Sequence, residues 1–417
     1  MDGAASLQQV QIRFFTKQEQ YAVTDAPTLV PVSLKRYGLS EIVNHLLGTP
    51  DTPTPFEFFI DGKLLRVSLA DYLRENDLST ENVVDVEYAV TVRPPSDLGT
   101  VPHDDWIAAV DLAGDAIVSG CYDGVVRVFN KSAELVRTLN SHEGPVTAVL
   151  ASASVENAAR LFSGSHDQTI IEWNSDDTAK LKYIGHEGSI TALAASAADR
   201  VLYSASWDGT VKAWKTGVSE DGMDEDEEAS AAIELSGKRR KGATPTKAAA
   251  TTFLGHTGAV MAVAVDQRNP SVLYSAGWDH TLRVWDAAST INTSNQNCNK
   301  PVNSMDHSVP SGLLATAHSD SAVRVWDLRT KDAAAMKLTM NTKQGWVSSL
   351  SWSDNSPFML ACAAYDATIK VIDIRAQAPL YTVKEAAEGS KVLSCKWRNG
   401  WLVSGGEDCT LHIRSCA

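Results

Sequence analysis

The sequence has 417 residues and lacks both long apolar stretches and paired cysteines. None of its windows approaches the roughly 18 uninterrupted apolar residues that a membrane helix needs. Its first residues, Met1 to Ala4, have neither the basic nor the apolar region of a secretory signal peptide. The six cysteines show no paired spacing, which favours reduced thiols. Together these absences predict a soluble, intracellular protein.

Basic residues are also few, because 37 Lys and Arg stand against 51 Asp and Glu and give a formal net charge of -14. A nucleic-acid-binding surface needs clustered positive charge, so we expect at most a minor direct contact with RNA. The chain also lacks a phosphate-binding loop, a metal-ligand cluster and a paired-carboxylate signature. We therefore expect no enzymatic activity and no cofactor of its own.

The sequence does contain one short phrase, which occurs seven times from Cys121 onward. Each copy has an aspartate in a turn and, six positions later, an aromatic residue or its replacement. The turn aspartates are Asp123, Asp167, Asp208, Asp279, Asp320, Asp366 and Asp408, at intervals of 44, 41, 71, 41, 46 and 42 residues. A period of about 40–45 residues with this pattern is typical of the WD-type propeller. The chain is therefore predicted to be mainly β, with a seven-bladed WD40 β-propeller over residues 106–417.

Three repeats carry a histidine that this fold type places beneath the turn aspartate. The pairs are His142 with Asp167, His186 with Asp208, and His256 with Asp279. A serine before each aspartate and a tryptophan after it complete a tetrad. These sets resemble Ser-His-Asp triads, but a catalytic triad needs an exposed nucleophile and an oxyanion hole. We interpret the tetrads as structural, with buried polar groups satisfying one another's hydrogen bonds.

The other repeats depart from this pattern. The same register places His103, Cys298, Lys343 and Glu388 at the histidine position of the first, fifth, sixth and seventh repeats. Ile372 and Arg414 replace the final tryptophan of the last two repeats. We expect the hydrogen-bond network inside those blades to be weaker.

The end of the chain leaves the ring incomplete. The last repeat finishes at Ser415, two residues before the C-terminus, so the seventh blade has only three strands of its own. An open strand edge invites aggregation, and propellers avoid it by borrowing a strand from the other terminus. The candidate is the stretch 91–101, so residues 93–105 are predicted to form a linker and the closing strand.

Residues 1–92 contain no such phrase and are predicted to form a separate α+β domain. We expect a first hairpin over 10–16 and 21–34, then a helix over 41–47 with Ser40 as its N-cap and Gly48 as its stop.

The second half of this region has equally clear signals. Asp61 and Gly62 form a primed hairpin turn between strands 56–60 and 63–67. Ser68 caps a short helix, and 83–90 is the last strand. This order of elements is that of the ubiquitin-like β-grasp fold. No Gly-Gly tail follows it, so conjugation to other proteins is not expected.

The one long interval between repeats contains a charged insert, predicted to be a disordered loop at about 217–250. It begins with an acidic run and then turns basic at Lys238, Arg239, Arg240 and Lys241. Such blocks of like charge are solvated. The basic run is either an ordinary charged loop or a nuclear localisation signal, and we favour the signal.

Two stretches carry a specific family resemblance. Residues 33–48, followed by the rest of the ubiquitin-like domain and then by Asp104-Asp105-Trp106, resemble the WD-repeat subunit of the Pescadillo-containing PeBoW complex, which assembles the large ribosomal subunit (60S). The N-terminal domain is similar to that of Notchless. The resemblance implies a non-enzymatic ribosome biogenesis factor of the nucleolus and nucleoplasm that acts in rRNA processing. Its implied partners are the block-of-proliferation WD-repeat protein, Pescadillo, the pre-60S particle and the AAA ATPase midasin.

The resemblance also implies one metal contact. Midasin of this type holds a Mg²⁺ ion in an adhesion site and leaves one octahedral position for a carboxylate of its partner, since the ion is hard. The glutamate that matches the family ligand is Glu81, and Asp77 and Glu75 are the fallback candidates. The alternative for Glu81 is an ordinary solvated acid in a turn.

A different function is a WD-repeat substrate receptor of a cullin ubiquitin ligase. Its support is Trp326-Asp-Leu-Arg329, a Trp-Asp-x-Arg phrase found in cullin adaptors. Many WD strands end in this way for packing reasons, so we prefer the ribosome assembly function.

Overall fold

The computed structural model describes residues 8–49, 53–77, 82–152, 160–196, 201–216, 244–329, 336–342, 345–376, 378–385 and 389–416. The chain divides into two compact units, one made of Met1–Pro94 with Asp373–Gln377 and the other of Pro95–Ile372 with Ala378–Ala417. Within the described residues, no helix has the length and apolar character needed to cross a membrane.

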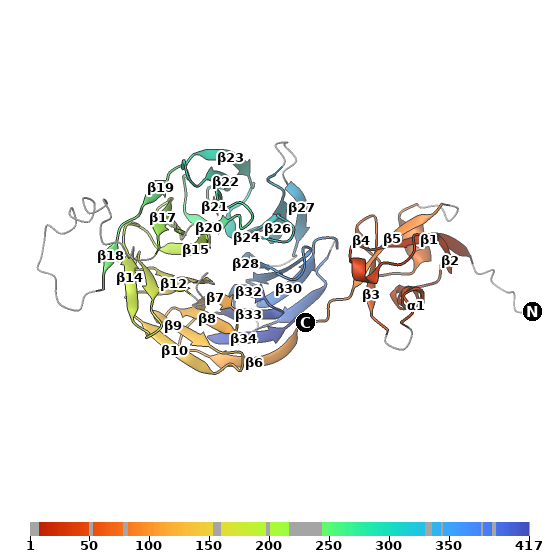
Figure 1. The fold of residues 1–417 in the computed structure, drawn as a ribbon, viewed down its shortest axis with the longest axis horizontal. Coiled ribbons are helices and arrows are strands. Elements are labelled where there is room, and N and C mark those ends of the chain that lie inside the picture. Colours follow the sequence, from red (N-terminus) through yellow and green to blue (C-terminus); the bar gives the residue numbers. More distant parts are fainter. Residues whose placement is uncertain are drawn as a thin grey trace, which may run out of the picture. The chain divides into compact units, whose positions relative to one another are not determined.

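The first unit contains a five-stranded sheet in the order β2-β1-β5-β3-β4 (Figure 1). Its strands are β1 (Gln9–Phe15), β2 (Thr28–Pro31), β3 (Phe56–Ile60), β4 (Lys63–Leu64) and β5 (Val84–Val90). The central strands β1 and β5 are parallel, whereas the other pairs are antiparallel. The helical segments are η1 (Glu19–Tyr21), α1 (Arg36–Leu46) and α2 (Leu69–Glu75). This arrangement confirms the predicted ubiquitin-like fold.

Alternation along β1 decides which face of this sheet is covered. Val10, Ile12 and Phe14 are buried, while the residues between them are not. The three side chains join a core that includes Leu39 and Val43 of α1. Each large apolar side chain that is buried in this way contributes about 1.5–3 kcal/mol to stability. Helix and sheet are therefore held together mainly by one apolar face of each.

The predicted start of the first helix is wrong. Helix α1 begins at Arg36, with Lys35 at the N-cap position and no side chain capping it, so Ser40 lies inside the helix. Its Oγ instead accepts a hydrogen bond from the Phe56 amide at 3.2 Å. Ser40 thus ties the helix to the start of β3. The helix ends before Gly48, whose φ of 71° is the left-handed geometry expected of a C-terminal glycine.

Two other local signals are confirmed. Asp61 and Gly62 have φ values of 50° and 74°, as a primed hairpin turn requires, although β4 is shorter than the predicted 63–67. Ser68 caps α2, because its Oγ accepts a hydrogen bond from the Asp71 amide at 3.2 Å. The first hairpin also differs from its prediction, since the short helical segment η1 precedes a β2 of only four residues.

Seven sheets make up the described part of the second unit and follow one another around a ring (Figure 1). We number them blades one to seven along the chain. Blades one to three contain β7 (Ile107–Ala113), β8 (Ala116–Cys121), β9 (Val125–Phe129) and β10 (Leu135–Asn140); β11 (Val146–Ser152), β12 (Arg160–Ser165), β13 (Ile170–Trp173) and β14 (Ala179–Tyr183); β15 (Ile190–Ser196), β16 (Val201–Ser206), β17 (Val211–Lys215) and β19 (Thr251–Phe253).

Blades four to seven repeat the same order of strands. They contain β20 (Val260–Val265), β21 (Val272–Gly277), β22 (Thr281–Asp286) and β23 (Asn292–Asn297); β24 (Val302–His307), β25 (Leu314–His318), β26 (Ala322–Trp326) and β27 (Met336–Asn341); β28 (Val347–Trp352), β29 (Met359–Ala364), β30 (Thr368–Asp373) and β31 (Tyr381–Lys384); β32 (Val392–Arg398), β33 (Trp401–Gly406), β34 (Thr410–Ser415) and β6 (Ser96–Pro102). The first strand of each blade is the innermost.

The seventh blade takes its fourth strand from the N-terminal side. Strand β6 pairs antiparallel with β34, from Ser96 opposite Ser415 to Pro102 opposite Thr410. The His103 amide extends this pairing with a hydrogen bond of 2.7 Å to the Cys409 carbonyl. The closing strand expected from the open edge is therefore present.

The end of the insert differs from the predicted loop. Strand β18 (Thr246–Lys247) pairs parallel with β14 and adds a fifth strand to the outer edge of blade two. The amides of Lys182 and Ile184 donate to the carbonyls of Pro245 and Lys247 at 2.9 and 3.0 Å. The predicted disordered span of 217–250 is too long at its C-terminal end, because the free edge of β14 offers unpaired backbone groups to the returning chain.

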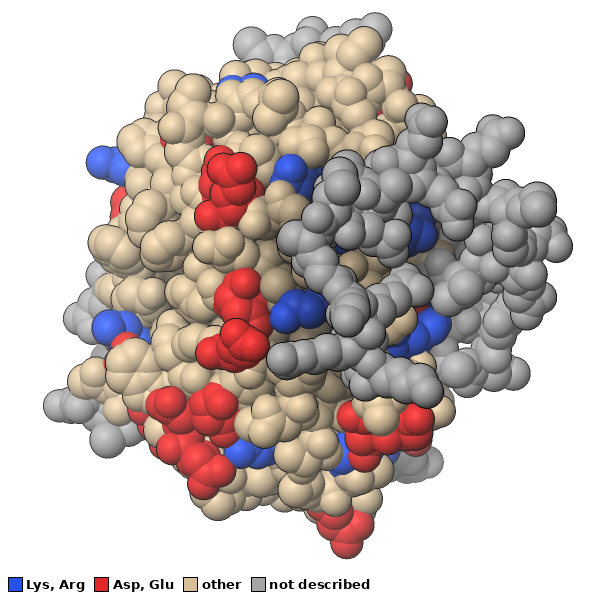
Figure 2. All heavy atoms as spheres, turned by 90° about the vertical axis from the view of Figure 1, so that its left-hand side faces the viewer, with Lys and Arg blue, Asp and Glu red and all other residues tan. Residues whose placement is uncertain are grey.

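The side of the propeller drawn in Figure 2 is electrostatically mixed. Acidic and basic side chains are interspersed among other residues, with no extended basic surface in its described part. Acidic and basic side chains also form ion pairs elsewhere on this unit, such as Lys131 with Asp115 at 2.5 Å.

Candidate functional site

The connection between α2 and β5 is the first candidate site, because the predicted metal ligand lies in it. Helix α2 ends at Glu75, and Asp77 has a left-handed φ of 52°. Asn76 fixes this end, since its side-chain amide donates to the Tyr72 carbonyl at 2.9 Å and its Oδ1 accepts from Lys63 Nζ at 3.1 Å. The chain therefore leaves the helix from a well-anchored residue.

Glu81 itself lies outside the described residues, so the prediction for it stays a prediction. The two fallback candidates, Glu75 and Asp77, are described and exposed at the end of α2. On the other side of the connection, Asn82 and Val83 are also exposed, whereas Val84 enters the core. The end of α2 thus presents two carboxylates to solvent.

The tetrads of blades two to four form the second group of predicted residues, and each is fully hydrogen-bonded. In blade two, His142 Nδ1 lies 2.9 Å from Asp167 Oδ2, and His142 Nε2 lies 2.8 Å from Ser163 Oγ. Trp173 Nε1 donates to the same hydroxyl at 2.8 Å.

Blades three and four repeat this network. His186 and His256 lie 2.7 Å from the carboxylates of Asp208 and Asp279. The serine hydroxyls complete both sets, at 2.7 Å from each histidine and at 2.9 and 2.7 Å from Trp214 and Trp285.

Chemistry orients the hydrogen bonds in these networks. A carboxylate only accepts, so Nδ1 of the histidine must donate to it, and a neutral imidazole then accepts at Nε2 from the serine hydroxyl. Burial alone raises the pKa of the Asp167 carboxyl, but hydrogen bonds from His142 and Thr169 outweigh it and hold this pKa well below its usual range. The same balance lowers the pKa of Asp208 and Asp279.

The tetrad serines cannot act as nucleophiles where they stand. Ser163, Ser204 and Ser275 are each 0 % exposed. A substrate carbonyl would have to enter the space between packed strands to meet them, and a hydrolase needs an accessible nucleophile beside an oxyanion hole. Their geometry serves the packing of the blades.

The remaining blades satisfy the turn aspartate differently. A basic side chain (Arg, Lys or His) lies four residues after the aspartate, on the third strand of the same blade. The pairs are Asp123 with Arg127 at 2.7 Å, Asp320 with Arg324 at 2.6 Å, Asp366 with Lys370 at 2.6 Å and Asp408 with His412 at 2.9 Å. We refer to these four contacts as the in-strand pairs.

The residues predicted to replace the tetrad histidines differ in their contacts. His103 occupies its position in blade one, where Nε2 lies 2.9 Å from Ser119 Oγ. Cys298 is fully buried at the fifth position. Lys343 and Glu388 lie outside the described residues, as do Lys238 to Lys241 of the insert.

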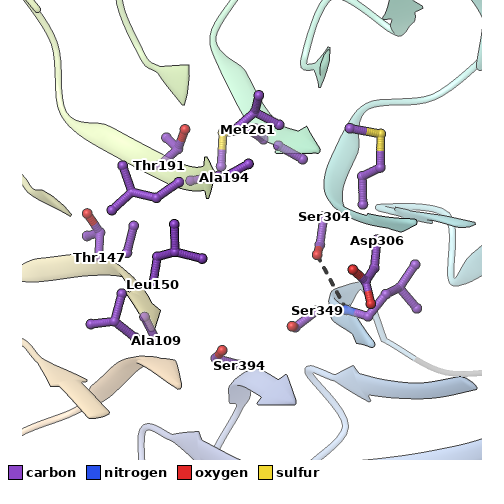
Figure 3. A pocket seen from close by; sticks show the side chains of 18 of the residues that line it. Ala109, Thr147, Leu150, Thr191, Ala194, Met261, Ser304, Asp306, Ser349 and Ser394 are labelled. Atoms are coloured by element: carbon purple, nitrogen blue, oxygen red, sulfur yellow. Dashed lines mark hydrogen bonds between the residues drawn. The ribbon is translucent and has the colours of Figure 1, made fainter. Parts of the chain in front are cut away.

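A central cavity of about 780 Å³ runs along the innermost strands. Figure 3 shows that its side chains come from all around the ring, with Ala109, Thr147, Leu150, Thr191, Ala194 and Met261 on one side, Ser304, Asp306 and Ser349 on the other, and Ser394 between Ala109 and Ser349.

Several polar groups of this cavity form hydrogen bonds with neighbouring blades. Asp306 accepts from the Trp352 amide at 2.8 Å, and Ser394 accepts from the Val110 amide at 3.1 Å. Ser304 accepts from the Leu350 amide at 3.4 Å, which is the dashed line in Figure 3. These contacts hold adjacent blades together. Within the part of the chain that the structure describes, no three His, Cys, Asp or Glu residues converge on a possible metal position.

The arginine of the Trp-Asp-x-Arg phrase, on which the cullin-adaptor reading depends, is bound within this chain. Arg329 forms an ion pair with Asp327 at 2.8 Å, and both residues belong to the Trp-Asp-x-Arg phrase. This contact gives the arginine a local structural role at the end of β26.

Comparison with known proteins now adds to this geometry. The model of the NLE (NUC135) domain matches residues 10–73, from β1 into α2. The model of the WD domain, G-beta repeat, matches residues 133–174, 178–215, 248–286, 290–327 and 336–373. The "Ribosome biogenesis protein WDR12 homolog" of Chlamydomonas reinhardtii is 36% identical over 444 residues, which cover 97% of each chain. The chain belongs to the WDR12 family of ribosome biogenesis proteins.

Other family members agree over the same length. The "Ribosome biogenesis protein YTM1" of Kluyveromyces lactis is 35% identical over 433 residues and 97% of each chain. The WDR12 homolog of Nematostella vectensis is 32% identical, over 98% of this chain and 100% of its own. Family membership therefore covers both units.

In this chain, the residue ranges of the matched WD repeats do not coincide with the blades. Residues 133–174 begin at β10, the outer strand of blade one, and end at β13, the third strand of blade two. Each blade therefore combines strands from two successive sequence repeats. This offset explains why the last repeat ends at a third strand and needs β6 to complete its sheet.

Proposed function

We propose that this chain is a non-enzymatic assembly factor of the large ribosomal subunit that acts in rRNA processing and maturation. The observation that carries the proposal is the likeness over nearly the whole chain to proteins named ribosome biogenesis proteins, which include both the NLE domain and the WD repeats. The buried tetrads add support, since they leave the propeller's most reactive-looking serines inaccessible. The two units then act as two docking modules on one chain.

In this proposal the propeller is a scaffold of the PeBoW complex and binds the block-of-proliferation subunit and Pescadillo on pre-60S particles. The ubiquitin-like domain is bound by midasin, which releases the factor. The metal belongs to midasin's adhesion site, and this chain supplies one carboxylate oxygen to it. Glu81 is the proposed ligand, and the exposed, anchored end of α2 supports a ligand in the connection that follows it.

The decisive experiment compares Glu81→Ala with the unmodified chain for binding to the midasin adhesion domain. Binding should collapse in the variant, and chelation of Mg²⁺ should abolish it in the unmodified chain. Glu81→Asp should also bind poorly, because its carboxylate is withdrawn by one methylene from an ion whose oxygen ligands lie at about 2.0–2.1 Å.

Two matched variants make the assignment specific. Glu75→Gln and Asp77→Asn each remove one exposed carboxylate from the same region and should leave binding nearly unchanged. If Asp77→Asn abolishes binding while Glu81→Ala does not, Asp77 is the ligand and the proposal moves to it. If none of the three matters, the metal contact is elsewhere and the release mechanism fails.

Nuclear import is proposed to use Lys238 to Lys241. A fluorescent fusion with these four residues replaced by Ala should lose nucleolar and nucleoplasmic accumulation. Residues 219–243 should be removable with the propeller still folded, because loop-closure entropy changes slowly with length and β18 is retained. Unchanged nuclear accumulation in cells that lack the partner subunits would remove the signal role.

A further inference from the structure

One face of the propeller displays a continuous row of aromatic rings. The row runs through Trp106, Tyr122, His166, Trp207 and Trp278, which we define as the aromatic arc. Successive ring centroids are 5.5, 6.3, 6.1 and 6.0 Å apart. The spacing is that of rings in mutual contact.

The fold repeats one backbone contact to build this arc. In each contributing blade, the residue before the turn aspartate donates its amide to the carbonyl of a residue just before the first strand. Trp207 donates to Ser189 at 3.0 Å, and Trp278 donates to Ala259 at 2.9 Å. Tyr122 donates to Trp106 at 2.9 Å, and both residues are aromatic. The rings therefore lie on one face, where four of them also line the mouth of the central cavity.

The indoles of the arc are exposed, unlike those of the tetrads. Trp106, Trp207 and Trp278 are 41%, 51% and 46% exposed, whereas Trp214 and Trp285 are each 1% exposed. Exposed tryptophans gathered in one patch mark a binding surface, and tryptophan is enriched among the residues that dominate protein interfaces. Packing of this chain alone gives these rings no reason to face solvent.

A lysine of the protein itself is bound by an aromatic ring of blade six and by a carboxylate. In blade six, Trp346 stacks on Tyr365 with a centroid separation of 5.9 Å. Lys391 Nζ lies 5.3 Å from the centroid of the Tyr365 ring and forms an ion pair with Glu407 at 2.8 Å. An aromatic ring and a carboxylate thus hold one ammonium group between them.

Carboxylates accompany the arc as well. Glu143 and Glu187 are exposed and follow the tetrad histidines on the segments that pair with the turns of His166 and Trp207. Their backbone amides bind Asp167 and Asp208 at 3.1 Å each, which fixes the residues and leaves their side chains at the surface. Aromatic rings with exposed carboxylates on the neighbouring segments favour a cationic ligand, and the carboxylates repel the phosphates of a nucleic acid.

We propose that the aromatic arc binds an extended, arginine-bearing segment of a partner protein, with guanidinium groups stacked on the indoles and paired with Glu143 and Glu187. Arginine is favoured over lysine because its planar cation stacks on a ring while its edge still donates to a carboxylate. The proposed function does not assign this surface or its ligand, and the binding does not depend on Glu81.

The test measures binding of the full chain to three capped 12-residue peptides, which alternate Ser with Arg, Lys or Glu, and to a 12-nucleotide oligo-dT. The order Arg, then Lys, then Glu is expected, with little binding of the oligonucleotide. Trp207→Ala and Trp278→Ala should each weaken the arginine peptide by roughly threefold to thirtyfold, the range of one cation–π contact. Glu187→Gln should weaken it too.

Two further variants separate stacking from general attraction to an acidic protein. Ile291→Ala, in the turn at the opposite end of β22 and 61% exposed, is the matched control and should change nothing. Lys391→Ala vacates Tyr365 and Glu407 and should tighten binding. The proposal is overturned if the glutamate peptide or oligo-dT binds as tightly as the arginine peptide, or if the tryptophan variants bind the arginine peptide like the unmodified chain.

Discussion

Blades two to four and the remaining blades solve the same problem in different ways. Every repeat places an aspartate in a tight turn, where burial disfavours its charge. In blades two to four a histidine from the preceding segment donates to that carboxylate. Its other ring nitrogen is hydrogen-bonded to a serine hydroxyl, which also accepts from a tryptophan indole. In blades one, five and six the in-strand pairs supply a full positive charge instead, and in blade seven His412 supplies one when it is protonated.

The comparison teaches that the aspartate, and not the histidine, is the fixed requirement of the blade. The tetrads need four residue types in register, whereas an in-strand pair needs only one cation on the adjacent strand. Blade seven extends this solution, since Arg414 binds Glu385 at 2.9 Å and Asp97 of β6 at 3.3 Å. Charge therefore links the last blade to the strand that closes the ring.

Removal of the closing strand should have the largest effect. A chain that starts at Trp106 lacks β6 and leaves β34 as an open edge, while one that starts at Val90 keeps it. Because a loss of about 5 kcal/mol lowers the melting temperature of a large domain by roughly 10–20 °C, the shorter chain should melt at least that much earlier or aggregate.

Thermal melts of both chains, with hydrogen exchange of the shorter one, check this prediction. Blade seven should lose its protection first and blades two to four last. Equal melting temperatures would show that β6 adds nothing to closure.

Breaking one in-strand pair should have the next largest effect. Lys370→Met leaves Asp366 without its cation in a site where Lys370 is nearly buried, and such a loss costs about 3–5 kcal/mol. Trp285→Phe removes one neutral hydrogen bond from a tetrad and should cost about 1 kcal/mol beyond its change in packing. Urea unfolding of the two variants ranks the two solutions. A milder effect of Lys370→Met would reverse the comparison.

Acid should affect the tetrads at specific pH values. The pKa of Asp167, Asp208 and Asp279 is lowered by folding, so their contribution is complete above the ordinary carboxyl pKa and is lost as pH falls below about 4. A loss of about 1–2 kcal/mol per site is expected. Asp279→Asn should flatten this part of a stability profile measured from pH 3 to 7. An identical slope in that variant would contradict the assignment.

Alkali should affect blade seven, by a smaller amount and with the opposite sign. Burial opposes the protonation of His412, but Asp408 and Glu385 outweigh it and raise its pKa. Its contribution is therefore complete below about pH 6.5 and is lost as pH rises through the raised value. NMR titration of the imidazole measures the pKa directly, and His412→Gln should remove the step from the stability profile. A pKa below that of a free histidine would disprove the pairing.

Much of this architecture could be predicted from the sequence, because the repeated turn aspartates mark every blade. The hairpin at Asp61 and Gly62 and the cap at Ser68 were equally readable, since each depends only on neighbouring residues. Ser40 was misjudged because its hydroxyl serves Phe56, a residue of another element.

The in-strand pairs were missed for a physical reason. Lys212 and Arg283 stand at the same spacing from Asp208 and Asp279 as Lys370 does from Asp366, yet they bond to Thr252 and Thr281. Whether the cation turns to the aspartate depends on whether a histidine from another segment has already reached it. Strand β18 was missed for a similar reason, since its partner β14 is distant in sequence. The aromatic arc could have been found from the aromatic residues that precede five of the turn aspartates.

The pairing of β6 with β34 has a consequence for how the protein is made. The ribosome synthesises β6 early and β34 among the last strands, so the emerging chain displays an unpaired strand edge throughout the production of the propeller. Ring closure must wait until β34 has left the exit tunnel, because contacts between such distant segments form late. A nascent copy of this chain is thus most vulnerable to premature strand exchange with neighbouring nascent copies just before β34 emerges to pair with β6.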